Sequence, residues 1–352
     1  MKIGVYADAH FSYSSSILAS SSDRYSTRLD TLVDTFEWMY QVFEDRDVDM
    51  IVSLGDLTSN PHLRAEEISA LNKALSYSKG TQEYHILGNH EILSNAKSKS
   101  KINSVNILDI ADNIQLVTEP MSVQDVILFP FPQGENEEIA GDLIDWSDEG
   151  NILLSHLNIL SEELMRQFDM TGVNHKVLKE NYELVVNGHI HKSEWVTNNV
   201  VNIGSLMGVD FGDEYHIHYP SVGIIDTDES DVNFVENPHA VRFVRLSPDS
   251  LYDLKESLNN LDDGKYALNL EVDYDIKDDV REVLESYDKV TTSRVRTKVN
   301  QVFTSELDDE KVEKITSFES GVDAFKSFID YINEPQYPKE TMKKVIDELH
   351  GG

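Results

Sequence analysis

The sequence contains no cysteine among its 352 residues. Disulfide bonds and thiolate metal sites are therefore excluded, and any bound metal must use His, Asp, Asn or Glu as ligands. The sequence also contains no apolar run of membrane-spanning length, and it opens on a strand-like segment, Met1–Val5, in place of a signal peptide. These absences predict a cytoplasmic protein.

Positive charge is scarce as well. The chain has 30 Lys and Arg residues against 64 Asp and Glu residues, which gives a formal net charge of -34. Such a charge repels nucleic acids at long range. It does not exclude a nuclease, because bound divalent cations, a basic partner or a local basic strip change the field near a site.

Short apolar runs alternate with segments of helical periodicity over residues 1–230. This alternation indicates an α/β fold. The predicted strands are Lys2–Ala7, Val48–Leu54, Glu83–Leu87, Ile114–Val117, Val126–Phe131, Ile152–Ser155, Leu184–Asn187, Val200–Ile203 and Val222–Ile225. The predicted helices are Thr27–Glu44 and Ala65–Ser78.

The pattern changes after about Asp228. Strands are predicted at Leu268–Val272 and Lys289–Val299 with a helix at Asp278–Glu285 between them, which forms a small α+β unit. Two amphipathic helices, Asp308–Ile332 and Lys339–Leu349, are predicted to end the chain. We therefore expect three domains, at residues 1–235, 236–304 and 305–352.

Polar patterns follow several of the predicted strands directly. In chain order they are Asp8-x-His10, Gly55-Asp56, Gly88-Asn89-His90-Glu91, Ser155-His156 and Gly188-His189-x-His191. Ligands of α/β folds gather beyond the carboxyl ends of strands, so we expect these patterns to form one site. Scattered buried polar residues at strand ends would be the alternative, and their ordered occurrence disfavours it.

The residue types in these patterns are metal ligands. The expected ligands are Asp8, His10, Asp56, Asn89, His156, His189 and His191. Residues two apart in an extended segment share a face, so Asp8 and His10 can bind one ion, and the two oxygens of Asp56 can bridge a pair of ions. This mixed set suits manganese, iron or zinc better than magnesium or calcium.

Two ions ~3.5–4 Å apart clamp a phosphate and activate a water for in-line attack. His90 is the spare histidine, and we expect it to orient the phosphate and protonate the leaving oxygen. Glu91 is expected to orient His90 or a ligand. His90 and Glu91 are thus the predicted catalytic residues beside the two metals.

The ordered set D-x-H, G-D, G-N-H-[DE], H and G-H-x-H resembles the calcineurin-like metallophosphoesterase superfamily over residues 1–230. Within it the chain looks most like SbcD-type DNA repair and recombination nuclease subunits, including those of large tailed phages. The features behind this likeness are Val201–Ser205, the acidic loop Phe211-Gly212-Asp213-Glu214, the strand Ser221–Asp226 and Val241-Arg242-Phe243.

The resemblance implies a fold, a ligand partition and partners. The fold would be an α/β protein, a β-sandwich flanked by helices (α/β/β/α), with a small α+β DNA-capping domain and a helical tail. Asp8, His10, Asp56 and His191 would hold one ion, and Asp56, Asn89, His156 and His189 the other. The partners would be DNA, a second copy of the chain, and an SbcC-type coiled-coil ATPase, because the chain has no Walker A pattern of its own. A phage-encoded protein would act in the host cytoplasm.

The chain departs from this pattern at two positions. Many relatives carry a second active-site histidine three residues after the bridging aspartate, where this chain has Ser59. The mechanism then either dispenses with that histidine or uses His62 in its place. The third pattern ends in Glu91, where Asp is commoner.

Two basic strips and one apolar stripe are candidates for partner contacts. The strips are Lys97, Lys99 and Lys101, and Arg294, Arg296 and Lys298, at every second residue. They either contact a phosphate backbone or are ordinary solvated charges. The apolar stripe of the tail includes Phe318, Val322, Phe325, Phe328 and Ile329, and it either docks on a coiled coil or covers the preceding unit. His216 and His218 repeat the H-x-H spacing, and we expect surface or groove residues there.

The sequence therefore predicts a manganese-dependent DNA endonuclease and exonuclease, the nuclease subunit of an SbcC/SbcD-type complex that processes DNA ends. One alternative is a small-molecule phosphodiesterase of the cyclic-nucleotide type, which shares the five patterns and suits the acidic surface. A second alternative is a catalytically weak scaffold that recruits an ATPase through residues 305–352. The Asp-Arg pair expected in a protein phosphatase soon after Gly55-Asp56 is missing.

Overall fold

The computed structural model describes residues 1–12, 25–92, 112–132, 134–160, 172–213 and 219–297. Contacts divide the chain into two compact units, Met1–Arg296 and Thr297–Gly352. The predicted tail helices fall in the second unit and lie outside the described residues. Within the described ranges, no helix is both long and apolar enough to cross a membrane.

The first unit contains two six-stranded sheets. The first sheet has the order β14-β13-β1-β2-β3-β4, in which β1 to β4 run parallel and β13 is antiparallel to β1. Its strands are β1 (Lys2–Tyr6), β2 (Met50–Ser53), β3 (Glu83–Ile86), β4 (Ile114–Val117), β13 (Ser221–Asp226) and β14 (Asp231–Glu236).

The second sheet has the order β11-β12-β10-β7-β6-β5. Its inner strands β12, β10, β7 and β6 are parallel, and both edge strands are antiparallel to their neighbours. Its strands are β5 (Met121–Val123), β6 (Val126–Phe129), β7 (Ile152–Ser155), β10 (Leu184–Asn187), β11 (Glu194–Trp195) and β12 (Val200–Asn202). A separate two-stranded pair is formed by β8 (Ile159–Leu160) and β9 (Val173–Asn174).

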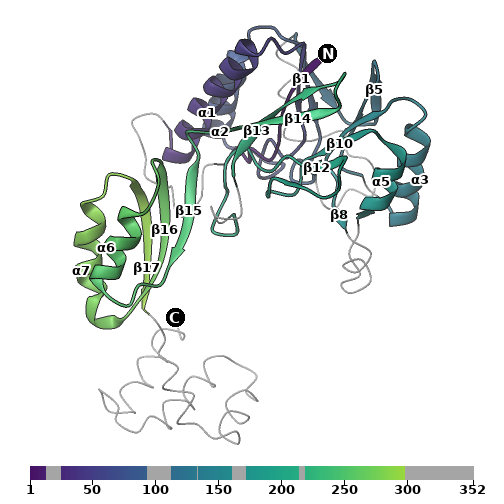
Figure 1. Ribbon diagram of the computed structural model, residues 1–352. Helices are drawn as coiled ribbons and strands as arrows, with labels where there is room; N and C mark the ends of the chain where they lie inside the picture. Colours follow the sequence, from purple (N-terminus) through teal and green to yellow (C-terminus); the bar gives the residue numbers. More distant parts are fainter. Residues whose placement is uncertain (13–24, 93–111, 133, 161–171, 214–218, 298–352) are drawn as a thin grey trace, which may run out of the picture. The chain divides into compact units, whose positions relative to one another are not determined.

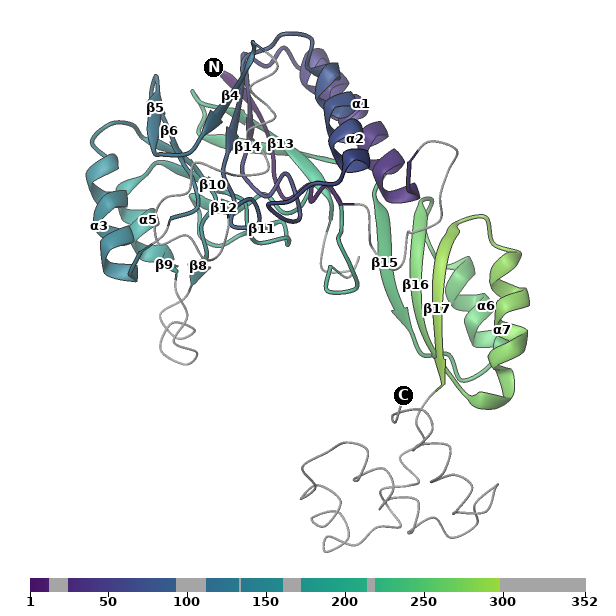
Figure 2. The same cartoon turned by 180° about the vertical axis from the view of Figure 1, so that it is seen from behind.

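The two sheets pack face to face with helices on both outer sides. Apolar side chains of both sheets, such as Val5 and Val186, share one buried cluster between them. Helices α1 (Thr27–Asp45) and α2 (Ala65–Leu75) pack with a second cluster, and α3 (Asn136–Trp146) and α5 (His175–Asn181) with a third. Figures 1 and 2 show the two helix pairs beside different sheets. The predicted α/β/β/α sandwich is confirmed.

The flanking helices begin where the sequence caps them. The Ser26 side chain accepts from the backbone N–H of Leu29, which satisfies a free donor in the first turn of α1. In α2, Glu67 reaches back to the backbone N–H of Arg64. A short 3-10 turn, Ser76–Ser78, follows α2, so the predicted helix Ala65–Ser78 is α-helical only to Leu75.

A third sheet forms a separate small core, which we call the small-sheet unit. It consists of β15 (Val241–Leu246), β16 (Lys265–Val272), β17 (Val290–Thr297), α6 (Leu251–Asn259) and α7 (Lys277–Glu285). Its apolar cluster joins the strands to both helices. The small α+β unit expected from the sequence is therefore present, while the division at residues 235 and 304 stays a prediction.

Three elements that the sequence left unassigned bury few residues each. α3 buries Ile139 and Leu143, and α6 buries Leu254 and Leu258, so neither has a long apolar stripe. The edge strand β14 buries Val232 alone among its six residues. Their positions depend on packing against neighbours more than on a periodic pattern of their own.

Candidate metal centre

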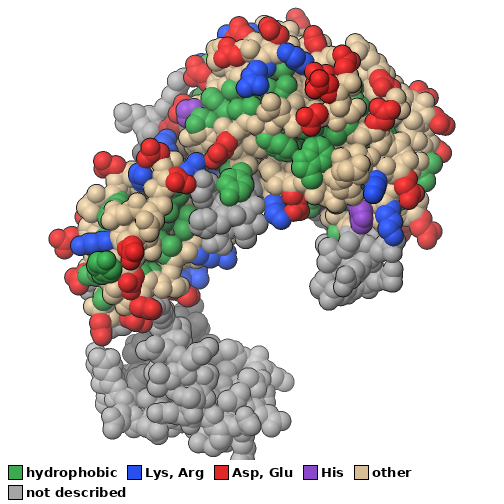
Figure 3. All heavy atoms as spheres, in the orientation of Figure 1, with side chains coloured by type: hydrophobic (Ala, Val, Ile, Leu, Met, Phe, Trp, Pro, Cys, Tyr) green, Lys and Arg blue, Asp and Glu red, His purple; other side chains and the backbone are tan. Residues whose placement is uncertain are grey.

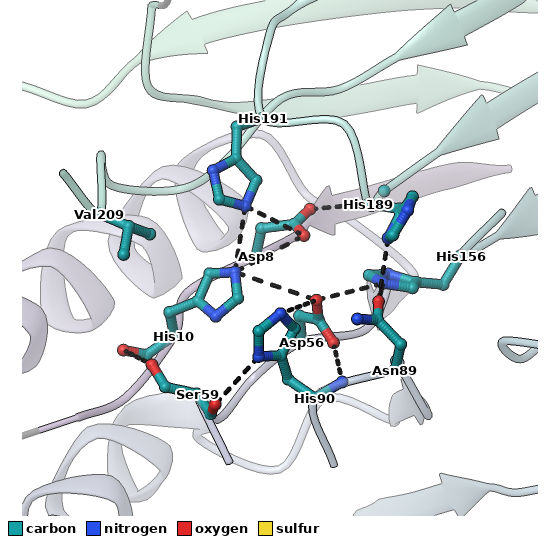
Figure 4. A network of polar contacts seen from close by, with 12 residues as sticks. Asp8, His10, Asp56, Ser59, Asn89, His90, His156, His189, His191 and Val209 are labelled. Atoms are coloured by element: carbon teal, nitrogen blue, oxygen red, sulfur yellow. Dashed lines mark hydrogen bonds and ion pairs between the residues drawn. The ribbon is translucent and has the colours of Figure 1, made fainter. Parts of the chain in front are cut away.

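The five polar patterns converge beyond the carboxyl ends of five parallel strands. Asp8 and His10 follow β1, and Asp56 follows β2. Asn89, His90 and Glu91 follow β3, His156 follows β7, and His189 and His191 follow β10. Because these strands belong to both sheets, the site lies at one end of the sandwich, and Figure 4 shows the side chains pointing toward a common centre.

The backbone at the site is not extended. Asp8, His10, Asp56 and His189 have φ angles of 52°, 50°, 50° and 69°, in the left-handed region. The expectation that residues two apart share an extended face was therefore wrong, because β1 and β10 end before these positions. Asp and His tolerate this region better than most side chains, and such strain is held by surrounding contacts.

Asp8, His10 and His191 form the first ligand cluster. The Nε2 atoms of His10 and His191 lie 3.1 Å apart, and Asp8 Oδ1 lies 3.9 Å and 3.8 Å from them. Asp8 Oδ1 is buried and has no hydrogen-bond partner among the described residues. A buried carboxylate oxygen facing two imidazole nitrogens fits a divalent cation, which would satisfy all three atoms.

Asp56, His156 and His189 form the second cluster, with Asn89 beside them. Asp56 Oδ2 lies 3.3 Å from His156 Nε2. Asn89 Oδ1 lies 3.1 Å from His156 Nε2 and 2.9 Å from His189 Nδ1. These nitrogen and oxygen atoms also fit a divalent cation.

Asp56 lies between the two clusters. Its Oδ2 atom is 3.9 Å from His10 Nε2 in the first cluster and 3.3 Å from His156 Nε2 in the second. Its carboxylate is thus the group that can touch two neighbouring ions. The geometry also brings His10, Asp56 and His90 together as a third possible ligand group, and the ligand partition implied by the resemblance stays a prediction.

Hydrogen bonds to the other ring nitrogen fix the orientation of His156 and His191. His156 Nδ1 lies 2.6 Å from the Leu54 carbonyl oxygen and therefore donates to it, which leaves Nε2 for the cluster. His191 Nδ1 lies 2.9 Å from Asp213 Oδ1, which leaves its Nε2 atom toward Asp8. The backbone N–H of His189 donates to Asp8 Oδ2 at 3.0 Å and links the clusters.

His90 lies at the open side of the clusters. Its Nδ1 atom donates to the Ser59 carbonyl at 2.9 Å, so its Nε2 atom faces Asp56 Oδ2 at 3.9 Å. The side chain is 46% exposed, whereas that of His191 is 28% exposed and Asp8, His10, Asp56 and His156 are buried. His90 also forms a possible ligand group with His10 and Asp56.

Glu91 supports the loop that carries the bridging aspartate. Its carboxylate accepts backbone N–H bonds from Gly88 at 2.8 Å, Asp56 at 3.2 Å and Thr58 at 2.8 Å. Glu91 therefore stabilises the loop that carries the expected ligand Asp56. Ser59 is a further brace, because its hydroxyl donates to the His10 carbonyl at 3.1 Å, whereas the His62 side chain is exposed.

Burial and charge shift the pKa values of the ligands. Burial lowers the pKa of His10 to about 3 and that of His189 to about 4. Burial also raises the pKa of Asp8 to about 7. For His156 burial acts downward, but the Asp56 carboxylate outweighs it and raises the pKa to about 9.

The carboxylates of the second cluster are shifted in opposite directions. Burial alone would raise the pKa of Asp56, but the charge of His156 outweighs it and holds this pKa below its usual range. Burial, aided by the nearby Asp56 charge, raises the pKa of Glu91 to about 8. In the metal-free protein a proton therefore occupies His156, in the place that a cation would take.

Some predicted contact residues lie away from this centre. Arg294 and Arg296 are exposed on β17 of the small-sheet unit. The other predicted contacts lie outside the described residues, as do His216 and His218. These contacts are Lys97, Lys99, Lys101, Lys298, Phe318, Val322, Phe325, Phe328 and Ile329.

Two residues with close contacts to the ligands had no assigned role in the sequence. Asp213 bonds His191, and the fully buried Arg28 donates to the His10 carbonyl at 3.3 Å. A signal for Arg28 was available, because it stands beside the apolar stripe of α1, where a charged residue is unusual. Asp213 lies in an acidic loop, and no nearby residue in the sequence indicates that it contacts His191.

Comparisons with known proteins give a family and distant structural likenesses. A family described as calcineurin-like phosphoesterase matches residues 1–193. No curated protein matches the chain.

Solved structures match at low identity. A protein of Thermus thermophilus is 12% identical, with a TM-score of 0.42, over 67% of this chain and 98% of that chain. A dimetal phosphatase from Danio rerio is 12% identical, with a TM-score of 0.39, over the same two shares. The nuclease MPE of Pseudomonas putida is 15% identical, with a TM-score of 0.27, over 56% of this chain and 65% of that chain.

Proposed function

The chain belongs to the calcineurin-like phosphoesterase family, and on that premise we propose that it is a manganese-dependent DNA nuclease. It cleaves phosphodiester bonds as an endonuclease and exonuclease, and it is the nuclease subunit of an SbcC/SbcD-type complex. Its substrates are DNA ends in repair or recombination, in the cytoplasm. Membership of the family supports a metal-dependent hydrolase. That its substrate is DNA is our proposal.

The observation that carries the proposal is the pair of ligand clusters that share Asp56. Oxygen and nitrogen ligands of this kind suit manganese, and two bound ions would supply Lewis-acid stabilisation of a phosphate and activate a water. Asp56 faces both positions, with its Oδ2 atom 3.9 Å from His10 Nε2 on one side and 3.3 Å from His156 Nε2 on the other. Asp8 Oδ1 is buried without a hydrogen-bond partner among the described residues, which gives a reason for a cation in the first cluster.

His90 is placed to handle the leaving-group proton. Its Nδ1–H is fixed on the Ser59 carbonyl, so a second proton can only sit on Nε2, which faces the clusters. A protonated Nε2 can donate to the oxygen that departs from phosphorus. The exposure of this ring leaves it accessible to a substrate, whereas the ligands Asp8, His10, Asp56 and His156 are buried.

Support for DNA comes from the small-sheet unit. A phosphodiesterase for small molecules needs no such addition, and β17 of this unit presents Arg294 and Arg296 to solvent. In a chain of net charge -34, exposed arginines on one strand favour phosphate-backbone contacts. The ATPase partner and the homodimer rest on the SbcD-type resemblance and are part of the proposal.

The charge of the chain favours one second candidate, a small-molecule phosphodiesterase. Figure 3 shows acidic side chains spread over the visible face, with Lys and Arg in small groups. Such a surface repels a polyanion and hinders a small phosphodiester far less.

The test compares cleavage of end-labelled linear duplex DNA by the purified chain in manganese, at low salt, with bound manganese counted by elemental analysis. We expect His90→Ala to keep two ions per chain and lose about 10²–10⁴-fold in rate. His175→Ala, which changes a histidine at the start of α5, is the matched control and should cleave normally.

Each outcome separates the alternatives. Loss of an ion in His90→Ala would make His90 a ligand and refute its role as the acid. Hydrolysis of bis(p-nitrophenyl) phosphate without DNA cleavage, even at low salt, would favour the small-molecule enzyme. Absence of both activities, together with capture of an SbcC-like ATPase, would favour the scaffold.

A further inference from the structure

The loop formed by residues 208–213, which we call the bridging loop, bonds the His191 ring directly and is joined to the His10 backbone through Arg28. We propose that Asp213 is a positioning residue for His191, and that the bridging loop couples the small-sheet unit to the first metal site but not to the second. This inference rests on the two metal sites of the proposed function. It does not depend on the identity of the substrate.

Asp213 joins the ligand to the loop with its two oxygens. Oδ1 lies 2.9 Å from His191 Nδ1, and Oδ2 accepts the backbone N–H of Val209 at 2.6 Å. The carboxylate side chain is only 10% exposed. A carboxylate behind a ligating imidazole fixes the ring orientation and makes the other nitrogen a stronger donor to a metal.

Arg28 ties the start of the same loop to His10. Its guanidinium donates to the Gly208 carbonyl at 3.1 Å and to the His10 carbonyl at 3.3 Å. The side chain is fully buried. Burial lowers the pKa of Arg28 to about 10, while the charges of Asp213 and Asp210 act in the opposite direction and favour its cation.

The bridging loop is therefore tied to both histidines of one cluster, to the His191 ring through Asp213 and to the His10 backbone carbonyl through Arg28. The second cluster is held differently, because His156 bonds the Leu54 carbonyl and Asn89 contacts both of its histidines. In Figure 4, Val209 lies on the side of His10 and His191, and His156 and Asn89 lie on the other side. A displacement of the loop would act on the first site.

The middle of the loop is anchored to the small-sheet unit. The Phe211 ring packs edge-on against Phe243 of β15, with centroids 5.3 Å apart, and both belong to a small buried cluster with Val241 and Ala267. Arg245 of β15 donates to the Phe211 carbonyl at 2.8 Å. Phe211 is two residues from Asp213, so a shift of β15 moves the group that orients His191.

This arrangement gives the small-sheet unit a physical route to one metal site. Force on β15 reaches His191 through Phe211 and Asp213, and it reaches His10 through Gly208 and Arg28. Closely packed groups of this kind transmit displacement because there is no empty space between them to absorb it. A macromolecule that binds the small-sheet unit would therefore change the occupancy or geometry of the first site.

The test is manganese binding to the full chain, followed by calorimetry and by electron paramagnetic resonance of the bound ions. We expect Asp213→Ala to weaken one of the two sites by about 10–100-fold and leave the other unchanged. Asp213→Asn keeps an oxygen that can accept from His191 Nδ1–H, so it should restore part of this loss. A purely structural role would weaken both sites together.

Arg245→Ala tests the coupling. It removes one hydrogen bond to the loop, far from any ligand, and should weaken the same single site by about 2–10-fold. Arg242→Ala is the matched control on the same strand, because that side chain bonds Asp263, Tyr266 and Glu236. Thermal unfolding in excess chelator identifies any variant that has lost its fold, and a variant lost in this way is replaced by Arg245→Lys or Asp213→Asn.

The outcomes decide between the parts of the inference. Equal weakening of both sites, or none, in Asp213→Ala would overturn the positioning role. Equal behaviour of Arg245→Ala and Arg242→Ala would overturn the coupling. Failure of the wild-type chain to cut DNA would refute only the nuclease proposal, whereas binding of fewer than two ions would overturn both.

Discussion

Metal binding at the second cluster must expel a proton from His156. The Nδ1–H of this histidine donates to the Leu54 carbonyl, so the additional proton of the charged ring sits on Nε2 and faces Asp56. A cation in the cluster needs the lone pair of that Nε2 atom. Asp56 raises the pKa of His156 to about 9 despite its burial, so the proton is present at neutral pH.

The cost of this proton follows from the pKa. The His156 pKa of about 9 lies two units above pH 7. Removing its proton at pH 7 therefore costs ~3 kcal/mol and lowers the metal affinity by a factor of ~100. The apparent affinity of the second site should therefore rise about tenfold per pH unit from pH 7 and level off near pH 9. At pH 8 roughly 0.9 proton should leave His156 for each ion bound there.

A pH-indicator assay counts these protons in weakly buffered solution at pH 8 with saturating manganese, under anaerobic conditions. Asp8, with a pKa of about 7, is already mostly ionised at this pH, while Glu91, with a pKa of about 8, is a second source of protons. His156→Asn keeps an oxygen ligand and carries no proton. Because the His156 charge lowers the pKa values of Asp8, Asp56 and Glu91, titration of the metal-free variant counts the protons these carboxyls gain, and the difference from wild type corrected for them gives the His156 contribution.

The expected difference, after this correction, is close to one proton per chain. Equal proton release by wild type and His156→Asn at saturation, after the same correction, would refute the reasoning. It would mean either that His156 is neutral before the metal binds or that it does not ligate the metal.

Three further predictions concern the same centre. Asp56→Ala should remove the shared carboxylate, so that elemental analysis finds fewer than two ions per chain and cleavage falls to background; two retained ions would contradict the bridging role. Gly55→Ala should destabilise the protein by ~1–3 kcal/mol more than Gly80→Ala in chemical denaturation, because a Cβ at residue 55 would lie 2.4 Å from His156 Nδ1 while the space around Gly80 is open and both have positive φ. Between pH 6.5 and 9 the metal-free protein should lose several kcal/mol of stability, since the raised pKa values of Asp8, Glu91 and His156 mean that the folded state binds more protons than the unfolded state in this window. A melting temperature that rises with pH across that window, in chelator, would contradict this last prediction.

Local pattern was informative wherever one segment carried its own signal. The strands Ile114–Val117, Ile152–Ser155 and Leu184–Asn187 have the predicted bounds, because short apolar runs bounded by polar residues leave little choice. Helix α3 was not predicted, since it buries only two residues and is held by its neighbours. The extended geometry expected at Asp8 and His10 was wrong, because a left-handed turn at a strand end has no apolar periodicity to reveal it.

By itself, the sequence determined which residues could carry the chemistry. The absence of cysteine restricted the ligands to oxygen and imidazole groups, and five polar patterns after apolar runs named the candidates, because strand ends in α/β folds are where ligands gather.

Only the tertiary structure decided how these residues are held. His191 meets Asp213 and Asp8, and Arg28 meets His10 and Gly208, through contacts between segments far apart in the chain, such as the 181 residues that separate His189 from Asp8. Such contacts depend on the order of strands in two sheets and on the loops between them. No local spacing encodes that order, so the support of the metal centre and its link to the small-sheet unit emerge only from the folded chain.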